Sequence, residues 1–98
     1  MKINWTRKGR QRLRQLHDHI ATDQPVNALR YIDKITRRVE VLATQPRSGK
    51  VVEKYRREDI REIYEGNYRI IYRVMVGQID ILTIRHGSRL LPDKLQHL

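Results

Sequence analysis

The amino-acid sequence predicts a small α+β domain with the element order β-α-α-β-β-β: an N-terminal strand, an antiparallel helical hairpin and a three-stranded antiparallel meander. Apolar residues recur every three or four positions between residues 9 and 42, which predicts helices. They alternate with polar residues between residues 60 and 85, which predicts strands. The 98 residues suffice for one modest core, so we expect a single domain over 1–98, with the helices packed on one face of the sheet.

The first element is a short strand. In MKINWT, Ile3 and Trp5 alternate with polar residues. Thr6 follows, and a threonine hydroxyl can accept a hydrogen bond from the first turn of a helix. The sequence therefore predicts that a helix begins directly after Thr6.

A helical hairpin comes next. The apolar stripe of its first helix contains Gly9, Leu13, Leu16 and Ile20, and we expect this helix to end near residue 21 or 22. Pro25 is typical of a helix's first turn. The apolar stripe of the second helix contains Ala28, Ile32, Ile35, Val39 and Leu42, which predicts a long helix over about Pro25 to Ala43. The short connection between the two predicts an antiparallel pair.

Three strands are predicted in the second half of the chain, after a loop in QPRSGK at residues 45–50. The stretch 51–59 is compatible with a strand edge or with an ordered loop. The predicted strands are Ile60 to Glu65, Tyr68 to Val76 and Ile79 to Arg85. Gly66-Asn67 and Gly77-Gln78 supply the turns between them. Residues 87–98 contain Pro92 and four leucines, and could form a final helical turn or a segment that orders only with a partner.

Strict alternation assigns the side chains of the meander to two faces. On the central strand, one face takes Tyr68, Ile70, Tyr72 and Val74, and the other takes Arg69, Ile71, Arg73 and Met75. On the last strand, Leu82, Ile84 and His86 oppose Ile81, Thr83 and Arg85. The second face of the central strand therefore predicts an exposed surface that is both apolar and cationic, which suits a partner helix or a nucleic-acid strand. The alternative is an ordinary solvated face whose arginines pair with nearby carboxylates.

The composition restricts the partners. Twenty-one basic residues against eleven acidic ones give a net charge of +10 and a pI of about 10.5, which favours a nucleic acid, a ribosome or an acidic protein. Without cysteine there are no disulfides or thiolate metal sites, and four scattered histidines have no ligand spacing, so we expect no metal and no cofactor. No apolar run approaches the roughly 20 residues that span a bilayer, so we expect a cytoplasmic protein.

Several motifs, taken together, resemble a known family. They are LATQPRSGK at 42–50, IREIYEGNYRIIYRV at 60–74 and ILTIRHGSR at 81–89, preceded by the strand with Trp5 and the two helices. In this combination, which covers nearly the whole chain, the sequence resembles the RelE/ParE superfamily of toxins from bacterial type II toxin–antitoxin modules, also known as plasmid stabilisation proteins. The resemblance implies a cognate antitoxin as partner and a hetero-oligomer with it.

Two targets occur in this superfamily. ParE-type toxins inhibit DNA gyrase and block replication, whereas RelE-type toxins cut mRNA on the ribosome. The pattern R-E-x-x-x-G-x-Y-R-I-I-Y-R followed by H-x-x-R is closer to ParE-type sequences. The C-terminal tyrosine of many RelE-type enzymes is missing, because Leu90, Leu91 and Pro92 follow Arg89. The resemblance therefore implies gyrase inhibition, with ribosome-dependent mRNA cleavage as the alternative.

The candidate site residues follow from this resemblance. A ParE-type toxin needs no catalytic residue, and its candidate target contacts are Arg85, His86 and Arg89. For a RelE-type enzyme the catalytic candidates are Arg61, Arg69 and His86, because RNA cleavage needs proton transfer and charge stabilisation. The candidate antitoxin contacts are Arg69, Ile71, Arg73 and Met75. A plain nucleic-acid-binding module is a third class that the charge supports, although no helix-turn-helix pattern is present.

Overall fold

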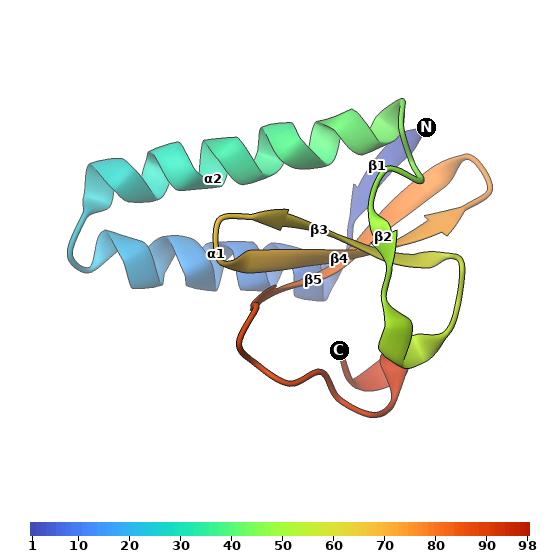
Figure 1. Cartoon of the computed structure of the whole chain (residues 1–98). Coiled ribbons are helices and arrows are strands. Elements are labelled where there is room, and N and C mark those ends of the chain that lie inside the picture. Colours follow the sequence, from blue (N-terminus) through green and yellow to red (C-terminus); the bar gives the residue numbers. More distant parts are fainter.

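Five strands form one sheet in a computed structural model that describes all 98 residues (Figure 1). The order across the sheet is β1-β5-β4-β3-β2. The strands are β1 (Lys2–Trp5), β2 (Lys50–Val51), β3 (Ile60–Glu65), β4 (Tyr68–Met75) and β5 (Gln78–His86). The predicted meander of β3, β4 and β5 is present, and β1 joins it by pairing in parallel with β5. The predicted fold class is confirmed.

The stretch 51–59 is partly strand and partly turn. Lys50 and Val51 pair antiparallel with β3 at the edge of the sheet. The chain then leaves the sheet through a single 3-10 turn, η2 (Glu53–Tyr55). Arg56 follows in the left-handed backbone region, at φ 51°, which ends that turn.

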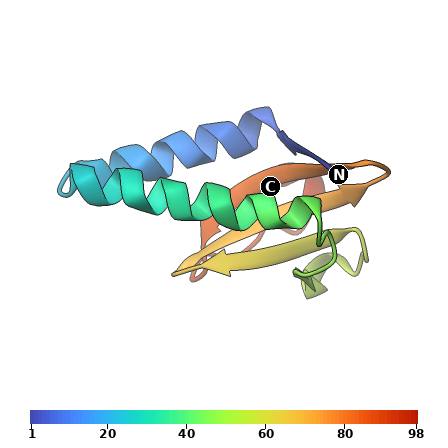
Figure 2. The ribbon, with the colours of Figure 1, turned by 90° about the horizontal axis from the view of Figure 1, so that it is seen from above.

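Both helices lie on one face of the sheet, side by side (Figure 2). Helix α1 (Arg7–Ala21) begins where predicted, because the Thr6 hydroxyl accepts a hydrogen bond from the Gly9 N–H at 3.0 Å. Helix α2 (Pro25–Glu40) continues into a 3-10 turn, η1 (Val41–Ala43). Together the two elements cover the range of the predicted second helix.

The first core fills the space between the helices and the sheet. The helices contribute Leu16, Ile35, Val39 and Leu42, and the sheet contributes Ile63, Ile70, Tyr72, Ile79, Ile81 and Ile84. Gly9 brings α1 close to β5, since a Cβ atom at this position would lie 2.5 Å from the Ile81 carbonyl oxygen. This close approach sets α1 directly beside the outer edge of β5.

A β-bulge interrupts the alternation of β5. Ile71 on β4 pairs with Thr83, but the next residue of β4, Tyr72, pairs with Ile81, so Leu82 has no partner on β4. The extra residue reverses the facing of the side chains beyond it. Ile81 and Ile84 therefore both pack in the first core, and the prediction that they lie on opposite faces is wrong.

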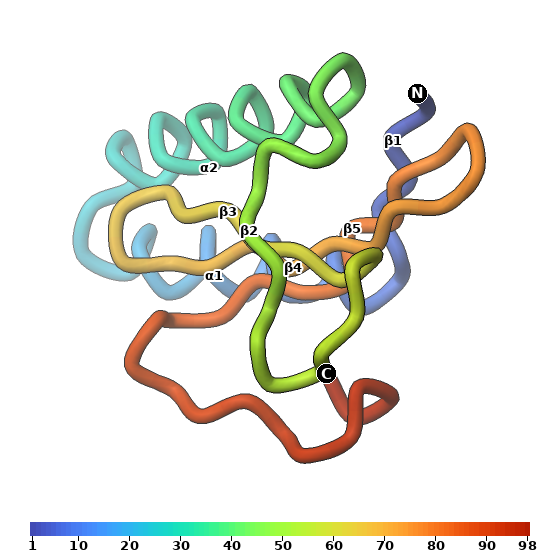
Figure 3. Tube along the Cα trace, turned by 45° about the vertical axis from the view of Figure 1, so that its right-hand side comes forward, coloured from blue at the N-terminus to red at the C-terminus, as the bar shows by residue number.

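The other face of the sheet carries a second core, which the C-terminal segment (residues 87–98) covers. Figure 3 shows this segment leaving β5, passing along the sheet opposite the helices and ending near η2. The second core comprises Val52, Ile60, Ile71, Leu91 and Leu98. The Tyr55 hydroxyl fastens the segment by donating to the Pro92 carbonyl at 2.7 Å.

Ile71 is consequently enclosed. Its side chain is 0% exposed, so the prediction that it presents an apolar contact on an open surface is wrong. The four leucines of the segment gave no strand or helix periodicity, which is why the sequence did not reveal that three of them cover this face. The segment includes one 3-10 turn, η3 (Leu95–His97). No helix of the protein is both long enough and apolar enough to cross a membrane.

Candidate functional site

The three predicted target contacts, Arg85, His86 and Arg89, lie together at the end of β5. They line a depression of about 190 Å³ between α1 and β5. Helix α1 contributes Arg12 and His19 to the same depression. We call these five residues with their depression the cationic pocket.

The end of β5 is accessible because β1 is short. The last pair between the two strands joins Trp5 to Ile81. At that point the Thr6 hydroxyl donates to the Ile81 carbonyl at 2.7 Å and the chain turns into α1. Beyond Ile81, the outer edge of β5 therefore faces a helix rather than another strand, and the side chains of both elements meet there.

Arg85 lies at this outer edge of β5 and makes few hydrogen bonds. Its Nη1 donates to the Leu90 carbonyl at 3.0 Å, whereas its Nε is buried and has no hydrogen-bond partner. Burial lowers the pKa of Arg85, and the nearby positive charges of Arg89 and Arg12 lower it further. The Nε of Arg12 is also buried without a partner. The local environment thus disfavours the positive charge of Arg85 unless an anion approaches.

His86 is held in place by the turn that follows it. The Ser88 N–H donates to His86 Nδ1 at 3.1 Å, and the Ser88 hydroxyl lies 2.7 Å from the same nitrogen. Because Nδ1 accepts, the neutral ring carries its proton on Nε2. The ring also meets Tyr68 edge-on, with centroids 5.3 Å apart. His86 therefore presents one fixed N–H donor from a defined position.

Arg69 lies on the face of the sheet away from the helices, in an ion pair with Glu62. Two guanidinium nitrogens donate to Glu62 Oε2, one of them at 3.2 Å. Glu62 is 4% exposed and the Arg69 side chain 15%. A second depression of about 410 Å³ adjoins this pair, and its cations also include Lys50, Lys54 and Arg89.

Arg61 fastens a loop. Its Nη1 donates to the Gly49 carbonyl at 2.8 Å, and its Nη2 donates to Glu58 Oε2 at 3.0 Å. Its side chain is 12% exposed. These contacts connect β3 to the loop before β2 and to the turn that precedes β3, so the guanidinium has a structural role.

The sheet does not bring the three RelE-type candidates together. Arg61 pairs with Tyr72 across β3 and β4 and shares the helix-covered face, while Arg69 points to the opposite face. His86 pairs with Tyr68, at the far end of β4 from Tyr72. General acid–base catalysis needs groups within hydrogen-bond reach of one substrate. The side chains of these three residues do not converge on one face of the sheet.

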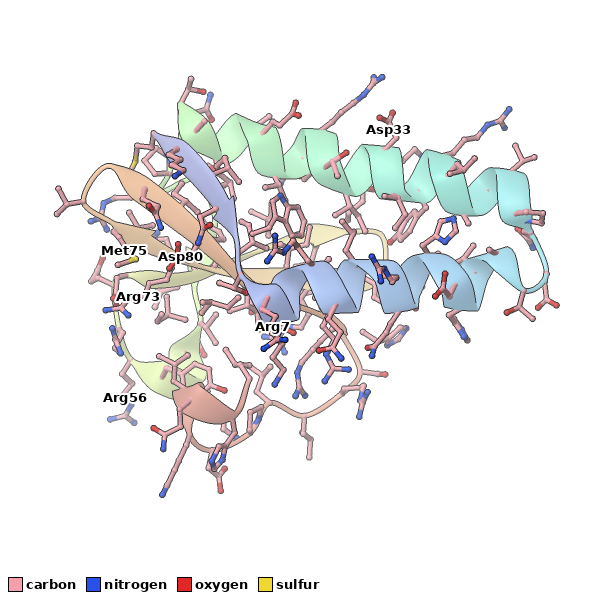
Figure 4. All side chains as sticks on the ribbon, turned by 180° about the vertical axis from the view of Figure 1, so that it is seen from behind. Arg7, Asp33, Arg56, Arg73, Met75 and Asp80 are labelled. Atoms are coloured by element: carbon pink, nitrogen blue, oxygen red, sulfur yellow. The ribbon has the colours of Figure 1, made fainter.

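The remaining candidate antitoxin contacts lie towards one end of the sheet. Arg73 Nε donates to Asp59 Oδ2 at 3.2 Å, and Met75 is 39% exposed. Figure 4 labels both side chains at this end. Unlike Ile71, they are accessible to a partner.

Sequence reasoning missed Arg12 and His19. The sequence shows that α1 is basic, but the pattern does not indicate which of its basic residues face β5. Their orientation depends on the close approach of α1 to β5 at Gly9 and on the position where β1 stops pairing with β5.

Comparisons with known proteins agree with the fold. A family model described as the ParE toxin of a type II toxin-antitoxin system, parDE, matches residues 3–91. A protein of Sinorhizobium fredii named "Putative toxin Y4kP" is 31% identical over 96 residues, or 96% of each chain.

Two solved structures share the architecture. A chain of the chromosomal ParDE TA system from P. aeruginosa superposes with a TM-score of 0.72 at 24% identity, over 90% of this chain and 97% of that one. A chain of the toxin–antitoxin complex RelBE2 from Mycobacterium tuberculosis gives 0.61 at 23% identity, over 87% and 95%. Since the family model spans nearly the whole sequence, the chain belongs to the ParE toxins of type II toxin–antitoxin systems, within the RelE/ParE superfamily.

Proposed function

We propose that this toxin inhibits DNA gyrase, and so replication, in the cytoplasm, and that a cognate antitoxin neutralises it by forming a hetero-oligomer with it. The observation that carries the proposal is the match of residues 3–91 to the ParE family. Resemblance to ParE-type toxins implies that DNA gyrase is the target. The neighbouring RelE-type toxins share the fold but cut mRNA, so the fold alone does not decide between them.

The arrangement of the basic side chains supports binding rather than catalysis. Arg85, His86 and Arg89 are adjacent and line one depression, where a protein–DNA complex could contact all three. Inhibition by trapping such a complex requires no bond to be made or broken by the toxin. The catalytic candidates for ribosome-dependent mRNA cleavage include Arg61 and Arg69, which point to opposite faces of the sheet, an arrangement that does not favour their joint action on one phosphate.

The antitoxin would contact the sheet end that carries Arg73 and Met75, with Arg69 on the same face towards the other end of β4. A segment that orders on binding must offset its lost conformational entropy, which favours a surface with apolar and charged groups together. We expect an Arg73→Glu variant to bind the antitoxin at least tenfold more weakly by calorimetry. An Arg30→Glu variant on exposed α2 is the matched control, and equal binding by both would remove Arg73 from the interface.

The decisive experiment uses the purified toxin, freed of antitoxin, in two assays. One measures gyrase supercoiling and cleavage-complex formation, and the other measures mRNA cutting on translating ribosomes. We expect blocked supercoiling with intact mRNA. We also expect Arg89→Gln to inhibit gyrase at least tenfold less potently than Arg30→Gln. Codon-positioned mRNA cuts with unaffected gyrase would contradict the proposal and favour the RelE-type activity.

A further inference from the structure

We propose that the cationic pocket binds a phosphodiester group of the DNA that gyrase holds, with Arg12, Arg85 and Arg89 as the groups that grip it. This inference rests on the proposed function, and it adds to it a ligand chemistry and a residue, Arg12 of α1. The target would then be recognised in part through its nucleic acid and not only through its protein.

The first reason is the absence of counter-charges in the pocket. No carboxylate lies within 4.0 Å of the guanidinium of Arg12, Arg85 or Arg89, since none of the protein's ion pairs includes them. By contrast, the arginines of the sheet interior and its other end each have a carboxylate partner: Arg61 pairs with Glu58, Arg69 with Glu62 and Arg73 with Asp59. Within the pocket, none of the three arginines has a carboxylate partner, so its positive charge is not balanced locally.

The second reason is a pair of buried donors. The Nε atoms of Arg12 and Arg85 are inaccessible to water and have no acceptor in the chain. A buried N–H without an acceptor is costly, and native proteins rarely keep two in one place without a use. An anion that binds the other guanidinium nitrogens of both arginines would offset part of this cost, because it would stabilise the positive charge that each group carries.

The third reason is the register of β4 and β5. Arg69 and Arg85 are directly opposite each other, an arrangement that is unfavourable for two like charges. Glu62 compensates Arg69, and Arg85 has no equivalent partner. The uncompensated charge of this cross-strand pair therefore belongs to Arg85, which lines the pocket with Arg12 and Arg89.

The lining of the pocket favours a nucleic-acid backbone over an acidic peptide. Its three apolar residues, Leu16, Tyr68 and Ile84, belong to or pack against the first core and offer no free anchor. Protein–protein contacts normally need such an anchor, whereas protein–DNA contacts are more polar and far more positive. Figure 4 shows nitrogen-tipped side chains crowded along the side of α1 that faces the C-terminal segment, which extends the positive surface beyond the pocket. The planar fork of arginine also matches a phosphate group.

The test is binding of the intact toxin, without gyrase, to a short fluorescent DNA duplex, followed by anisotropy over a range of KCl concentrations. Each phosphate contact contributes about 0.9 to the slope of log affinity against log salt. We expect Arg12→Gln, Arg85→Gln and Arg89→Gln each to lower the affinity about tenfold near physiological ionic strength. Because the three arginines share one phosphate group, we expect the triple variant to lower the slope by about 0.9 and each single variant by part of that amount. Thermal unfolding of each variant identifies any loss that comes from misfolding.

Arg14→Gln is the matched control, because Arg14 is exposed on the same helix, carries the same charge and does not line the pocket. It should lower affinity less than twofold and leave the slope within about 0.3 of the unmodified toxin. Arg12→Lys keeps the charge without the fork, so it should retain the slope and lose affinity. Equal losses for Arg12→Gln and Arg14→Gln would overturn the proposal, because binding would then depend on overall charge alone.

Two further probes separate the sources of the anion. A labelled poly-glutamate of matched charge should bind at least tenfold more weakly than the duplex and should not respond to Arg12→Gln; equal, Arg12-dependent binding would overturn the phosphodiester assignment. Preference for an RNA strand of the same sequence would overturn the assignment to DNA. Gyrase assays of the same variants distinguish the two proposals. If Arg12→Gln abolished DNA binding but still inhibited gyrase, phosphodiester binding in the cationic pocket would be refuted as part of the mechanism, and gyrase inhibition would stand. If the unmodified toxin bound DNA through the pocket but did not inhibit gyrase, only the proposed gyrase inhibition would be refuted.

Discussion

Glu62 on β3 accepts two hydrogen bonds from the Arg69 guanidinium on β4, in a nearly enclosed ion pair on the face of the sheet that the C-terminal segment covers. Removing one partner of a buried pair leaves the other charge unpaired, which costs about 3–5 kcal/mol. We expect Glu62→Gln to lower the free energy of unfolding by about 3 kcal/mol in urea titrations, since Arg69 keeps some access to water.

The exposed pair Arg37–Asp33 on α2 provides the control, because both of its side chains are more than half exposed. Asp33→Asn should change the free energy of unfolding by no more than about 0.5 kcal/mol. Similar effects of Glu62→Gln and Asp33→Asn would show that the Glu62–Arg69 pair is not buried in solution.

Leu90 and Leu91 are neighbours in sequence with opposite environments. Leu91 is 8% exposed in the second core, whereas Leu90 is 91% exposed. We expect Leu91→Ala to cost about 2–4 kcal/mol of unfolding free energy and Leu90→Ala less than about 0.5 kcal/mol. If chemical denaturation gave equal values, the C-terminal segment would not pack on the sheet as described.

The hydroxyl of Tyr72 crosses from the first core to the loop before β2. It donates to the Pro46 carbonyl at 2.8 Å and accepts from the Gly49 N–H at 3.0 Å. Tyr72→Phe would leave that buried N–H without its acceptor, so we expect a loss of about 1–3 kcal/mol in thermal or urea unfolding. A control is Tyr64→Phe on the same sheet, whose side chain is exposed and whose hydroxyl has no hydrogen bond within the chain, with an expected change below about 0.5 kcal/mol.

The carboxyl group of Asp59 is expected to make the free energy of unfolding depend on pH in the acidic range. A hydrogen bond from Arg57 is the main reason that the pKa of Asp59 lies below its ordinary value of 3.8. A carboxyl group with a depressed pKa stabilises the fold above its unfolded pKa, and this stabilisation is lost as the pH falls through the folded value. We therefore expect the urea midpoints of the unmodified protein and Asp59→Asn to differ at neutral pH and to converge well below pH 3.8.

Arg57→Gln tests the cause. It removes the largest contribution to the shift and should narrow the difference between neutral and acid stability, although Arg73 still donates to Asp59 at 3.2 Å. An unaltered pH profile in Arg57→Gln would assign the effect to another group.

Most of the architecture could be predicted from the sequence, because each element depends on local chemistry. The helix beginning after Thr6 and the helix beginning at Pro25 follow from capping and proline geometry, and the three later strands follow from alternation. The bulge at Leu82 could not be predicted, since one extra residue in β5 becomes visible only against the register of β4. The covering of Ile71 likewise depends on contacts with residues 20 or more positions further along the chain.

The candidate site divides in the same way. Arg85, His86 and Arg89 were found because the family motif places them next to one another in sequence, and the structure brings them into one depression. Arg12 was not found, because it is more than 70 residues away and reaches the site only through the packing of α1 against β5. The pairing of Arg69 with Glu62 also needed the register of β3 and β4, which alternation alone does not specify.

The parallel pairing of β1 with β5 has a consequence for the protein's synthesis on the ribosome. The strand made first must wait for the strand made last, 76 residues later in the register. At roughly 5–20 residues per second this delay is about 4–15 s, during which Ile3 and Trp5 have no sheet to pack on. A nascent chain that stalls before Gln78 therefore cannot complete the sheet or set α1 beside β5. The pocket that holds the proposed target contacts would form only when translation of β5 is finished, so an incompletely translated toxin is expected to be harmless to the cell that makes it.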